Sequence, residues 1–341
     1  MSDQPLLSVR SLSVDFSNYG RSSRVLREVS LDVAARRHVA LVGESGCGKS
    51  VTMRAIMGIL PATATTASGR ILFDGRDLNA LRPSEREALR GTAMSMVFQD
   101  PMTALNPVFT IGDQMATILK YADRRLGRPR DRRGRVARVH EVLRQVRMPD
   151  PERIAGAYPH QLSGGQCQRI SIAMALAMGP QVLIAMALLS EPRLLIADEP
   201  GTALDVTTQA QILALLRDLV EDRGLALLMI THNLGVVRES ADYVYVMYAG
   251  SVVEHGPTAE LFAHPSHPYT RALIDCVPKL SGDTTFRGID GTLPDYSAPP
   301  PGCRFSPRCA LATPVCERAP ADTSVSADHG VACWHIDEVA A

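Results

Sequence analysis

Alternation of apolar and polar residues is the main pattern near the start of the chain. Residues 7–16 alternate in this way and predict a strand with one exposed face. Residues 25–33 and 69–73 continue in a strand-like pattern. The three segments together predict a small antiparallel sheet, which we expect around the glycine-rich segment at residues 43–50.

A second pattern consists of short, continuous apolar runs separated by helical segments. The runs that predict buried strands lie at residues 38–42, 94–98, 194–198 and 226–230. The helical patterns lie at residues 83–90, 113–150 and 207–222. Because apolar strands that alternate with helices are typical of a parallel sheet covered on both faces, the predicted fold class is α/β.

Composition narrows the class of protein further. A chain of 341 residues with 45% apolar side chains can hold two domains, and its formal net charge of zero argues against a general affinity for nucleic acid. The N-terminus lacks a secretory signal, so we expect a cytosolic protein. Residues 170–190 carry no charge across 21 positions, but Gly179-Pro180 in their middle and chemical motifs on both sides argue against a membrane span.

A complete phosphate loop follows the apolar run at residues 38–42. It reads Gly43-Glu44-Ser45-Gly46-Cys47-Gly48-Lys49-Ser50, and Val51 follows it in a helical pattern. A strand, a glycine-rich turn and a helix present backbone N–H groups to an anion. Lys49 is expected to reach the outer phosphates of a nucleoside triphosphate, and the Ser50 hydroxyl to ligate Mg²⁺.

Polar residues at the ends of the other apolar runs are candidates for catalysis. Asp198 is suited to holding Mg²⁺, and Glu199 to polarising a water that attacks the γ-phosphate. His232 is a candidate to position that water, and Gln99 to bind Mg²⁺ or its waters. The alternatives are a solvated acidic pair, a structural histidine and an ordinary glutamine.

One further motif connects these residues to a known family. Residues 162–166 read Leu-Ser-Gly-Gly-Gln, and the motifs occur in the order seen in ATP-binding-cassette (ABC) ATPases, which the chain resembles. The resemblance implies a P-loop NTPase cassette with a RecA-like parallel core, an antiparallel β subdomain and a helical subdomain at about residues 100–170. It also implies that two cassettes face each other and that the signature of one closes on the ATP of the other.

The resemblance assigns further nucleotide contacts. The signature residues that would reach ATP across the dimer are Ser163, Gly164, Gly165 and Gln166, at a helix N-terminus that favours phosphate. Asp205, in the segment after the catalytic carboxylates, is also expected near the nucleotide. Adenine stacks on an aromatic residue of the early sheet in this family, for which Tyr19 is our candidate and Phe16 the alternative.

Longer stretches resemble the peptide and nickel importer branch, and in particular the D-type ATP-binding subunits of dipeptide and oligopeptide importers. They are GESGCGKSVTMRAIMGIL, VFQDPMTALNP, ALDVTTQAQIL and, before the cysteine-bearing tail, HPYTRAL. The resemblance covers nearly the whole chain. It implies a cassette over residues 1–256 and, where proline, glycine and cysteine become more frequent, a C-terminal extension over residues 257–341.

The same resemblance implies partners and a location. We expect a heterodimer with a paralogous ABC ATPase subunit, docked on two membrane permeases at the cytoplasmic face of the inner membrane, with no nucleic acid involved. A periplasmic or lipid-anchored binding protein would deliver the peptide. Nickel complexes or glutathione-like molecules are alternative cargoes, and a soluble ABC ATPase of DNA repair or translation, or a non-hydrolysing regulatory partner, is an alternative function.

Four of the seven cysteines are clustered near the C-terminus, at Cys303, Cys309, Cys316 and Cys333. Their spacings lack the CxxC pairs of most structural zinc sites. Four thiolates are suited to a [4Fe–4S] cluster, which the resemblance also implies, whereas zinc and unligated thiols are alternatives. Arg304 and Arg308 would place cations beside the thiolates.

A tandem repeat sets the chain apart from the family pattern. Residues 172–183 and 184–195 are identical at seven of twelve positions, so about twelve residues are inserted between the signature and Asp198. As helix they would add roughly 18 Å, which is too much to keep both motifs at one nucleotide. We therefore expect residues 177–192 to bulge outward.

Overall fold

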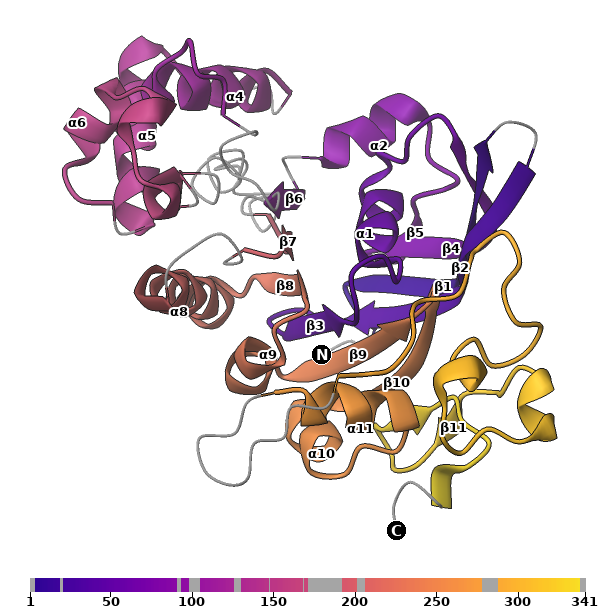
Figure 1. Ribbon diagram of the computed structural model, residues 1–341. Helices are drawn as coiled ribbons and strands as arrows, with labels where there is room; N and C mark the ends of the chain where they lie inside the picture. Colours follow the sequence, from indigo (N-terminus) through magenta and orange to yellow (C-terminus); the bar gives the residue numbers. More distant parts are fainter. Residues whose placement is uncertain are drawn as a thin grey trace. The chain divides into compact units, whose positions relative to one another are not determined.

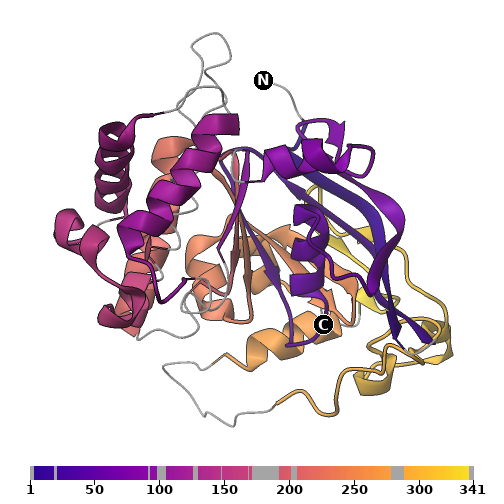
Figure 2. The ribbon, with the colours of Figure 1, turned by 90° about the horizontal axis from the view of Figure 1, so that it is seen from above.

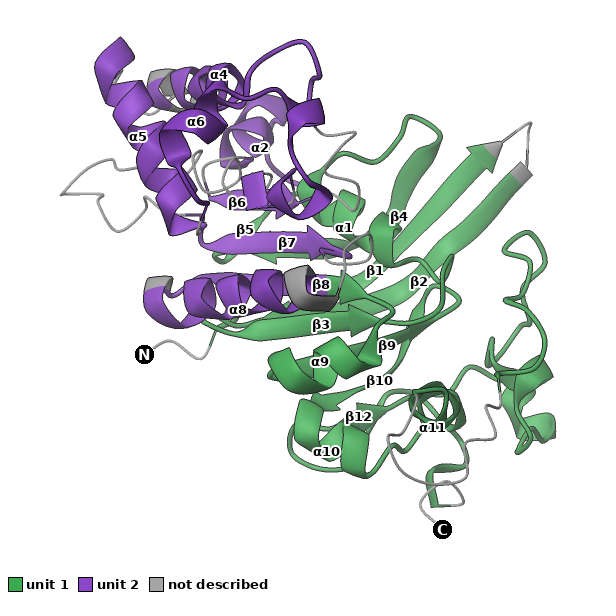
Figure 3. Ribbon diagram, turned by 60° about the vertical axis from the view of Figure 1, so that its left-hand side comes forward, with its two compact units in different colours: residues 1–79, 230–341 green, residues 80–229 purple. Residues whose placement is uncertain are grey.

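The computed structural model describes residues 4–18, 21–90, 93–97, 105–125, 130–146, 148–167, 169–170, 192–200, 206–277 and 288–337. These residues form two compact units, coloured separately in Figure 3. The first unit comprises residues 1–79 and 230–341, and the second comprises residues 80–229.

An antiparallel sheet forms the N-terminal part of the first unit (Figure 1). Its order is β2-β1-β4-β5, and the strands are β1 (Leu7–Asn18), β2 (Arg21–Val33), β4 (Ala64–Phe73) and β5 (Arg76–Asp77). Burial along β1 changes from Leu7 and Val9 to Leu12 and Val14, because the pairing shifts at Ser11, which has a φ of 46°. The sheet expected from residues 7–16, 25–33 and 69–73 is therefore confirmed, with a bulge that the alternation did not predict.

A second, mixed sheet in this unit has the order β11-β12-β10-β9-β3. Its strands are β3 (His38–Val42), β9 (Tyr243–Tyr248), β10 (Ser251–Pro257), β11 (Thr323–Ser324) and β12 (Gly330–Val331). β3 and β9 are parallel, whereas β10 pairs antiparallel with both β9 and β12. The last residues of the chain thus add strands to a sheet that begins at residue 38.

Helices cover both faces of this sheet. They are α1 (Lys49–Met57), α9 (Leu234–Ser240), α10 (Thr258–Ala263) and α11 (Pro268–Asp275). Figures 1 and 3 show α1 on one face of β3 and β9, and α9 and α10 on the other. This arrangement agrees with the parallel, doubly covered sheet that the apolar runs predict.

The C-terminal segment, residues 288–337, has little regular structure beyond β11, β12 and two short 3₁₀ helices, Ser306–Arg308 and Pro314–Glu317. In Figure 2 this segment, in yellow, runs beside the long strands β1 and β2. Arginine side chains attach it: Arg27 Nη1 donates to Gly302 O (3.1 Å), and Arg304 donates to the carbonyls of Arg24 and Ala249.

The second unit combines three strands with a group of helices. Its elements are α2 (Pro83–Leu89), β6 (Met94–Val97), α4 (Ile111–Arg125), α5 (Arg132–Gln145), α6 (Pro151–Gly156), β7 (Leu194–Asp198), α8 (Val206–Arg223) and β8 (Ala226–Thr231), which ends just past its boundary. β6 and β7 are parallel, and β8 follows β7 in the sheet order. The strands and helices expected at residues 83–90, 94–98, 194–198, 207–222 and 226–230 are confirmed within one or two residues of their ends.

One apolar core joins α4, α5 and α6 to β7 and α8. Its buried side chains include Met115, Leu143, Ile154, Leu195 and Leu216. α5 begins where the Asp131 carboxylate accepts a hydrogen bond from Gly134 N (2.7 Å). Across the part of the chain that the structure describes, every helix is too short or too polar to cross a membrane.

Candidate nucleotide-binding site

The phosphate loop connects the buried strand β3 to helix α1. Gly43, directly after β3, has a φ of 151°, and a Cβ there would collide with the carbonyl oxygen of Met247 on β9. Gly48, directly before α1, has a φ of 111°, and a Cβ there would lie 2.8 Å from Leu26 Cδ2. Both positions therefore require glycine, for its backbone conformation and for its lack of a side chain.

The N-terminus of α1 is built to receive an anion. Gly48 supplies no side-chain cap, so amide donors of the first turn are directed at the end of the helix. Ser45 and Gly46 are exposed, and Ser50 and Val51 are partly buried in the first turn. The Ser50 hydroxyl is thus in the first turn, at the position from which this type of loop holds Mg²⁺.

Lys49 folds back over the loop that precedes it. Its Nζ donates to the carbonyl oxygens of Gly43 (2.7 Å) and Glu44 (2.9 Å), and the residue is 6% exposed. Cys47 Sγ lies 3.8 Å from Nζ, and burial raises the pKa of this thiol despite the neighbouring ammonium. The cation expected to bind the outer phosphates is therefore held inside the curve of the loop by backbone oxygens.

Three residues from far along the chain also contact the loop. The Tyr269 hydroxyl accepts a hydrogen bond from Glu44 N (3.0 Å), Arg308 Nη1 lies 3.0 Å from Glu44 Oε2, and the Tyr296 hydroxyl donates to Gly46 O (2.7 Å). None of these three residues was predicted from the sequence to belong to the site. Tyr269 lies in the HPYTRAL stretch, which was the one available signal, but a single tyrosine has no pattern that indicates its contact.

His232 follows β8 and is exposed, and Asn233 after it caps α9 by accepting a hydrogen bond from Val236 N (3.3 Å). His232 belongs to the first unit, as the phosphate loop does. Its position at the end of a buried strand is the one expected from the apolar run.

The second unit carries the expected catalytic carboxylates. Asp198 is the last residue of β7 and is 8% exposed. Glu199 follows it, partly buried, with a φ of 47°. A left-handed conformation is uncommon for a residue other than glycine, asparagine or aspartate, and such strained positions cluster at functional sites. The backbone thus turns sharply at the residue expected to polarise the attacking water.

The signature also lies in the second unit, at the start of a helical turn. Ser163 N donates to Gln166 Oε1 (3.0 Å), and Gln166 N donates to Ser163 Oγ (3.3 Å), which forms a reciprocal capping box. Ser163 and Gly164 are exposed, and Gly165 is buried. The exposed serine and glycine are available at the surface, as a contact across a dimer requires.

Several predicted positions lie outside the described residues: Tyr19, Gln99, Asp205 and most of the tandem repeat. Phe16, the alternative to Tyr19, is partly buried in β1, opposite Ser23 and Ala64. The roles expected for the undescribed positions stay predictions.

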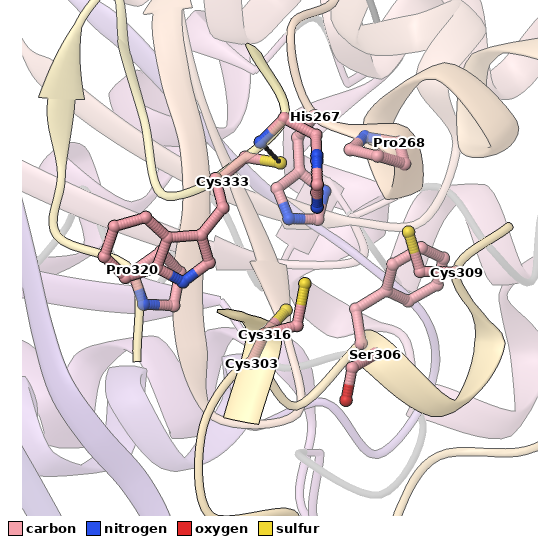
Figure 4. A pocket seen from close by; sticks show the side chains of 11 residues that line it. His267, Pro268, Cys303, Ser306, Cys309, Cys316, Pro320 and Cys333 are labelled. Atoms are coloured by element: carbon pink, nitrogen blue, oxygen red, sulfur yellow. Dashed lines mark hydrogen bonds between the residues drawn. The ribbon is translucent and has the colours of Figure 1, made fainter. Parts of the chain in front are cut away.

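The four C-terminal cysteines line one small pocket, shown in Figure 4. Its cavity is about 10 Å³, and His267, Phe305 and Trp334 also contribute to its wall. Cys303 N donates a hydrogen bond to Cys316 O (2.9 Å), so these two cysteines are neighbours in the pocket wall. The four cysteines therefore surround one pocket, although they are spread over residues 303–333.

The pocket is smaller than the metal site expected from the sequence. The donor set suits a cluster, but the cavity is about the size of a single water. Over the described ranges, we find no group of three or more histidine, cysteine or acidic side chains arranged to hold a metal ion. Burial raises the pKa of Cys303 to about 11 and raises those of Cys309 and Cys333, so these thiols are neutral at pH 7.

Arg304 and Arg308, which were expected to place cations beside the thiolates, bind other groups. Arg304 donates to the carbonyl oxygens of Ala249 and Arg24, and Arg308 binds Glu44 of the phosphate loop. Both arginines therefore attach the cysteine-bearing segment to the first unit and leave the thiols without a cationic partner among these contacts.

Comparison with known proteins establishes the class. Residues 26–185 match the family ABC transporter, and residues 253–316 match the family Oligopeptide/dipeptide transporter, C-terminal region. Among solved structures, the ATP-binding cassette MJ0796, a dimer bound to ADP and phosphate, has a TM-score of 0.63 at 25% identity, covering 74% of this chain and 98% of that one. The protein cbiO1 of Clostridium perfringens, part of the ABC transporter complex cbiONQ, has a TM-score of 0.61 at 26% identity, covering 76% of this chain and 92% of that one.

Curated relatives narrow the assignment. The Dipeptide transport ATP-binding protein DppD of Bacillus subtilis is 45% identical over 98% of this chain and 96% of its own. A probable peptide ABC transporter ATP-binding protein of Sinorhizobium fredii is 44% identical over the same shares. The chain belongs to the ABC transporter family, as one of its ATP-binding cassettes that use ATP and Mg²⁺. The fold class and the family resemblance are confirmed.

Proposed function

We propose that this chain is the ATP-hydrolysing subunit that energises import of di- or oligopeptides through a membrane ABC transporter. The observation that carries the proposal is similarity over 98% of the chain to a dipeptide transport ATP-binding protein, which includes the C-terminal region typical of such transporters. Nickel complexes and glutathione-like molecules are the alternative cargoes, because the cassette itself does not contact the cargo.

The geometry of the phosphate loop supports specific roles. Lys49 would neutralise the outer phosphates, and Ser50 with Asp198 would hold Mg²⁺. Glu199 would polarise the attacking water, which His232 would orient. Gln99, Asp205 and Tyr19 would complete the site for metal and nucleotide, and the signature at residues 163–166 would close on the ATP of a second cassette. Mg²⁺ would supply neutralisation of the charge that develops on the phosphates.

The partners follow from the same proposal. We infer a heterodimer with a related cassette, docked on two permeases at the cytoplasmic face of the membrane, and a separate binding protein that delivers the peptide. In this assembly residues 1–256 act as the cassette and residues 257–341 as an extension of it. The capping box of the signature supports the inference, since it presents Ser163 and Gly164 at the surface.

Glu199→Gln tests the catalytic role. The variant should bind ATP as the wild type does, lose steady-state hydrolysis and accumulate the closed dimer on size-exclusion chromatography with ATP. Lys49→Ala is the matched control, because it should lose ATP binding itself and give no dimer. Hydrolysis at the wild-type rate by Glu199→Gln would exclude its proposed role.

Reconstitution distinguishes transport from the alternative functions. The chain is expressed with its partner cassette and permeases, and uptake of di-, tri- and pentapeptides, a nickel complex and glutathione is measured in proteoliposomes. ATP-dependent uptake of peptides supports the proposal. Uptake of nickel or glutathione alone would change the cargo, and co-purification with ribosomes or DNA instead of permeases would favour the soluble ATPase.

An iron–sulfur cluster at Cys303, Cys309, Cys316 and Cys333 is a finer proposal. It is supported by the gathering of the four thiols at one pocket, although that pocket would have to open to admit a cluster. Anaerobic purification should then give absorbance near 400 nm and about four irons per chain. A colourless protein without iron would exclude the cluster, and bound zinc would identify the alternative metal.

The tandem repeat is the feature that fits ATP hydrolysis least well, because it lengthens the segment between the signature and Asp198. Because residues 171–191 lie outside the described part of the chain, the expected bulge stays a prediction. Deletion of residues 184–195 restores the spacing of the family and should raise ATPase activity or folding yield. An unchanged or lower activity would show that the extra residues do not disturb the site.

A further inference from the structure

Glu44, the second residue of the phosphate loop, is held at two points by residues far along the chain. Its backbone N–H donates to the Tyr269 hydroxyl (3.0 Å), across 225 positions of sequence. Its carboxylate pairs with Arg308 (3.0 Å), across 264 positions. The loop expected to bind ATP is thus fixed near its start by the C-terminal extension.

Arg308 is itself rigidly positioned. Its guanidinium makes four hydrogen bonds, to Glu44 Oε2, the Tyr248 hydroxyl, and the carbonyl oxygens of Asp290 and Ile289. The side chain is 6% exposed and lies 5.7 Å from the centre of the Tyr248 ring. The other three hydrogen bonds fix the orientation of the guanidinium. The ion pair with Glu44 therefore does not require a mobile side chain to become ordered, as an ion pair between exposed residues does.

Tyr269 is positioned with the same precision. The residue is fully buried, and its ring packs against Tyr248 (4.7 Å between centres) and Phe305 (5.4 Å). Tyr248 is the last residue of β9 and directly follows Met247, whose carbonyl oxygen leaves no room for a side chain at Gly43. The hydroxyl that accepts from Glu44 N is therefore part of the same packed group that shapes the start of the loop.

A third contact fixes the tip of the loop. The Tyr296 hydroxyl donates to Gly46 O (2.7 Å), and Leu293 Cδ1 would lie 3.5 Å from a Cβ at Gly46. Residues 289–308 thus touch the loop at both Glu44 and Gly46. Other bonds of the extension, such as Arg27 Nη1 to Gly302 O (3.1 Å), attach it to β2 without touching the loop.

We propose that Arg308 and Tyr269 are positioning residues for ATP, which hold Glu44 so that the phosphate loop is preorganised for the nucleotide. The C-terminal extension then sets nucleotide affinity in addition to completing the fold. This inference rests on the proposed function only in taking the loop as the ATP site. Its physical basis is that a loop fixed in advance loses less conformational freedom when the ligand binds.

The test measures equilibrium binding of a fluorescent ATP analogue with Mg²⁺ to the purified full chain, together with the thermal midpoint of each variant. Arg308→Met should weaken binding about 10- to 100-fold, the range for losing a hydrogen bond to a charged group. Tyr269→Phe keeps the packed ring, removes only the hydroxyl and should weaken binding by a smaller factor. Arg308→Lys keeps the charge without the planar fork and should restore binding in part.

Arg27→Met is the matched control, since it removes an arginine–carbonyl bond that attaches the extension but does not reach the loop. It should change the thermal midpoint without weakening ATP binding. A double-mutant cycle isolates the pair: Glu44→Gln combined with Arg308→Met should bind no more weakly than Arg308→Met alone.

Three results would overturn the inference while leaving the proposed function intact. They are wild-type affinity in both Arg308→Met and Tyr269→Phe, an equal loss in Arg27→Met, and additive losses in the cycle. If Arg308→Met does not fold, Tyr269→Phe and the Glu44→Gln single variant decide the matter. Failure of the wild-type chain to bind ATP would instead refute the proposed function.

Discussion

A buried carboxylate on β10 gives the sharpest stability prediction. Glu254 is 0% exposed, and it accepts hydrogen bonds from Ser266 N (2.6 Å), His267 N (3.0 Å) and His329 Nε2 (2.8 Å). His329 is 2% exposed and directly precedes β12, the strand that pairs with β10. The pair therefore fastens the C-terminal segment to the sheet of the first unit.

Glu254→Gln removes the charge but keeps the shape. Breaking a buried pair by changing one partner costs about 3–5 kcal/mol, and we expect the lower end because the amide keeps one acceptor oxygen. A loss of about 3 kcal/mol in the free energy of local opening corresponds to roughly 100-fold faster amide hydrogen exchange. Exchange at β10 and β12, measured by mass spectrometry, checks this value.

The same pair should make stability depend on pH. The hydrogen bond to Glu254 raises the pKa of His329 above its ordinary 6.5, so the folded chain holds this proton more tightly than the unfolded chain. The stabilisation is complete below pH 6.5 and is lost as the pH rises through the raised pKa. Burial lowers the pKa of His267 to about 4, so the unfolded chain binds this proton more tightly than the folded chain. His267 therefore makes the folded chain less stable as the pH decreases from 6.5 to 4.

A control and two outcomes decide this prediction. Glu85→Gln removes an exposed ion pair to Arg82 and should leave exchange at β10 and β12 unchanged. Glu254→Gln should also reduce the loss of protection above pH 6.5, after correction for intrinsic exchange rates, while Glu260 Oε1, 3.3 Å from His329 Nδ1, preserves part of it. Unchanged protection in Glu254→Gln, or the same slope above pH 6.5, would refute the argument.

Further predictions concern glycine, a helix cap and the phosphate loop. Gly250 and Gly75 have φ values of 85° and 75°, but only at Gly250 would a Cβ collide with Val25 O. Gly75→Ala should therefore reduce the free energy of unfolding by about 1 kcal/mol, and Gly250→Ala by several times as much. Thermal denaturation measures both values. Asp131→Ala removes the cap of α5 and should cost about 1 kcal/mol, whereas Asp131→Asn should cost much less. Lys49→Met should abolish binding of the fluorescent ATP analogue with an unchanged circular dichroism spectrum, and retained binding would contradict the role given to Lys49.

Local patterns were sufficient to predict most strands and helices. The continuous apolar runs at residues 38–42 and 194–198 correspond to β3 and β7 because both strands are buried on both faces. The strand, the glycine-rich turn and the helix around residues 43–50 were predicted equally well, since Gly43, Gly46 and Gly48 have positive φ values that residues other than glycine rarely adopt. The bulge at Ser11 was missed, because it results from pairing with two neighbouring strands and leaves no mark on the alternation.

Contacts between distant segments could not be predicted from such patterns. Nothing in the sequence around Arg308 shows that it binds Glu44 and not the adjacent cysteines. The outcome depends on where β9 and α11 place Tyr248 and Tyr269: the guanidinium lies over the Tyr248 ring, and the Tyr269 ring packs against that ring. Chemistry carried by one motif is therefore readable from sequence, whereas the residues that orient the motif are not.

The segment between Cys303 and Cys309 joins two features that the sequence suggested were separate. Phe305 packs against Tyr248 and Tyr269, and Arg308 binds Glu44, while the cysteines at its two ends line the pocket. Arg308 directly precedes Cys309 in the chain, so a ligand that displaced the backbone at Cys309 would also displace the backbone at Arg308. The cysteine pocket and the phosphate loop are thereby connected through the Arg308 side chain, which is the contact on which our inference about nucleotide affinity rests.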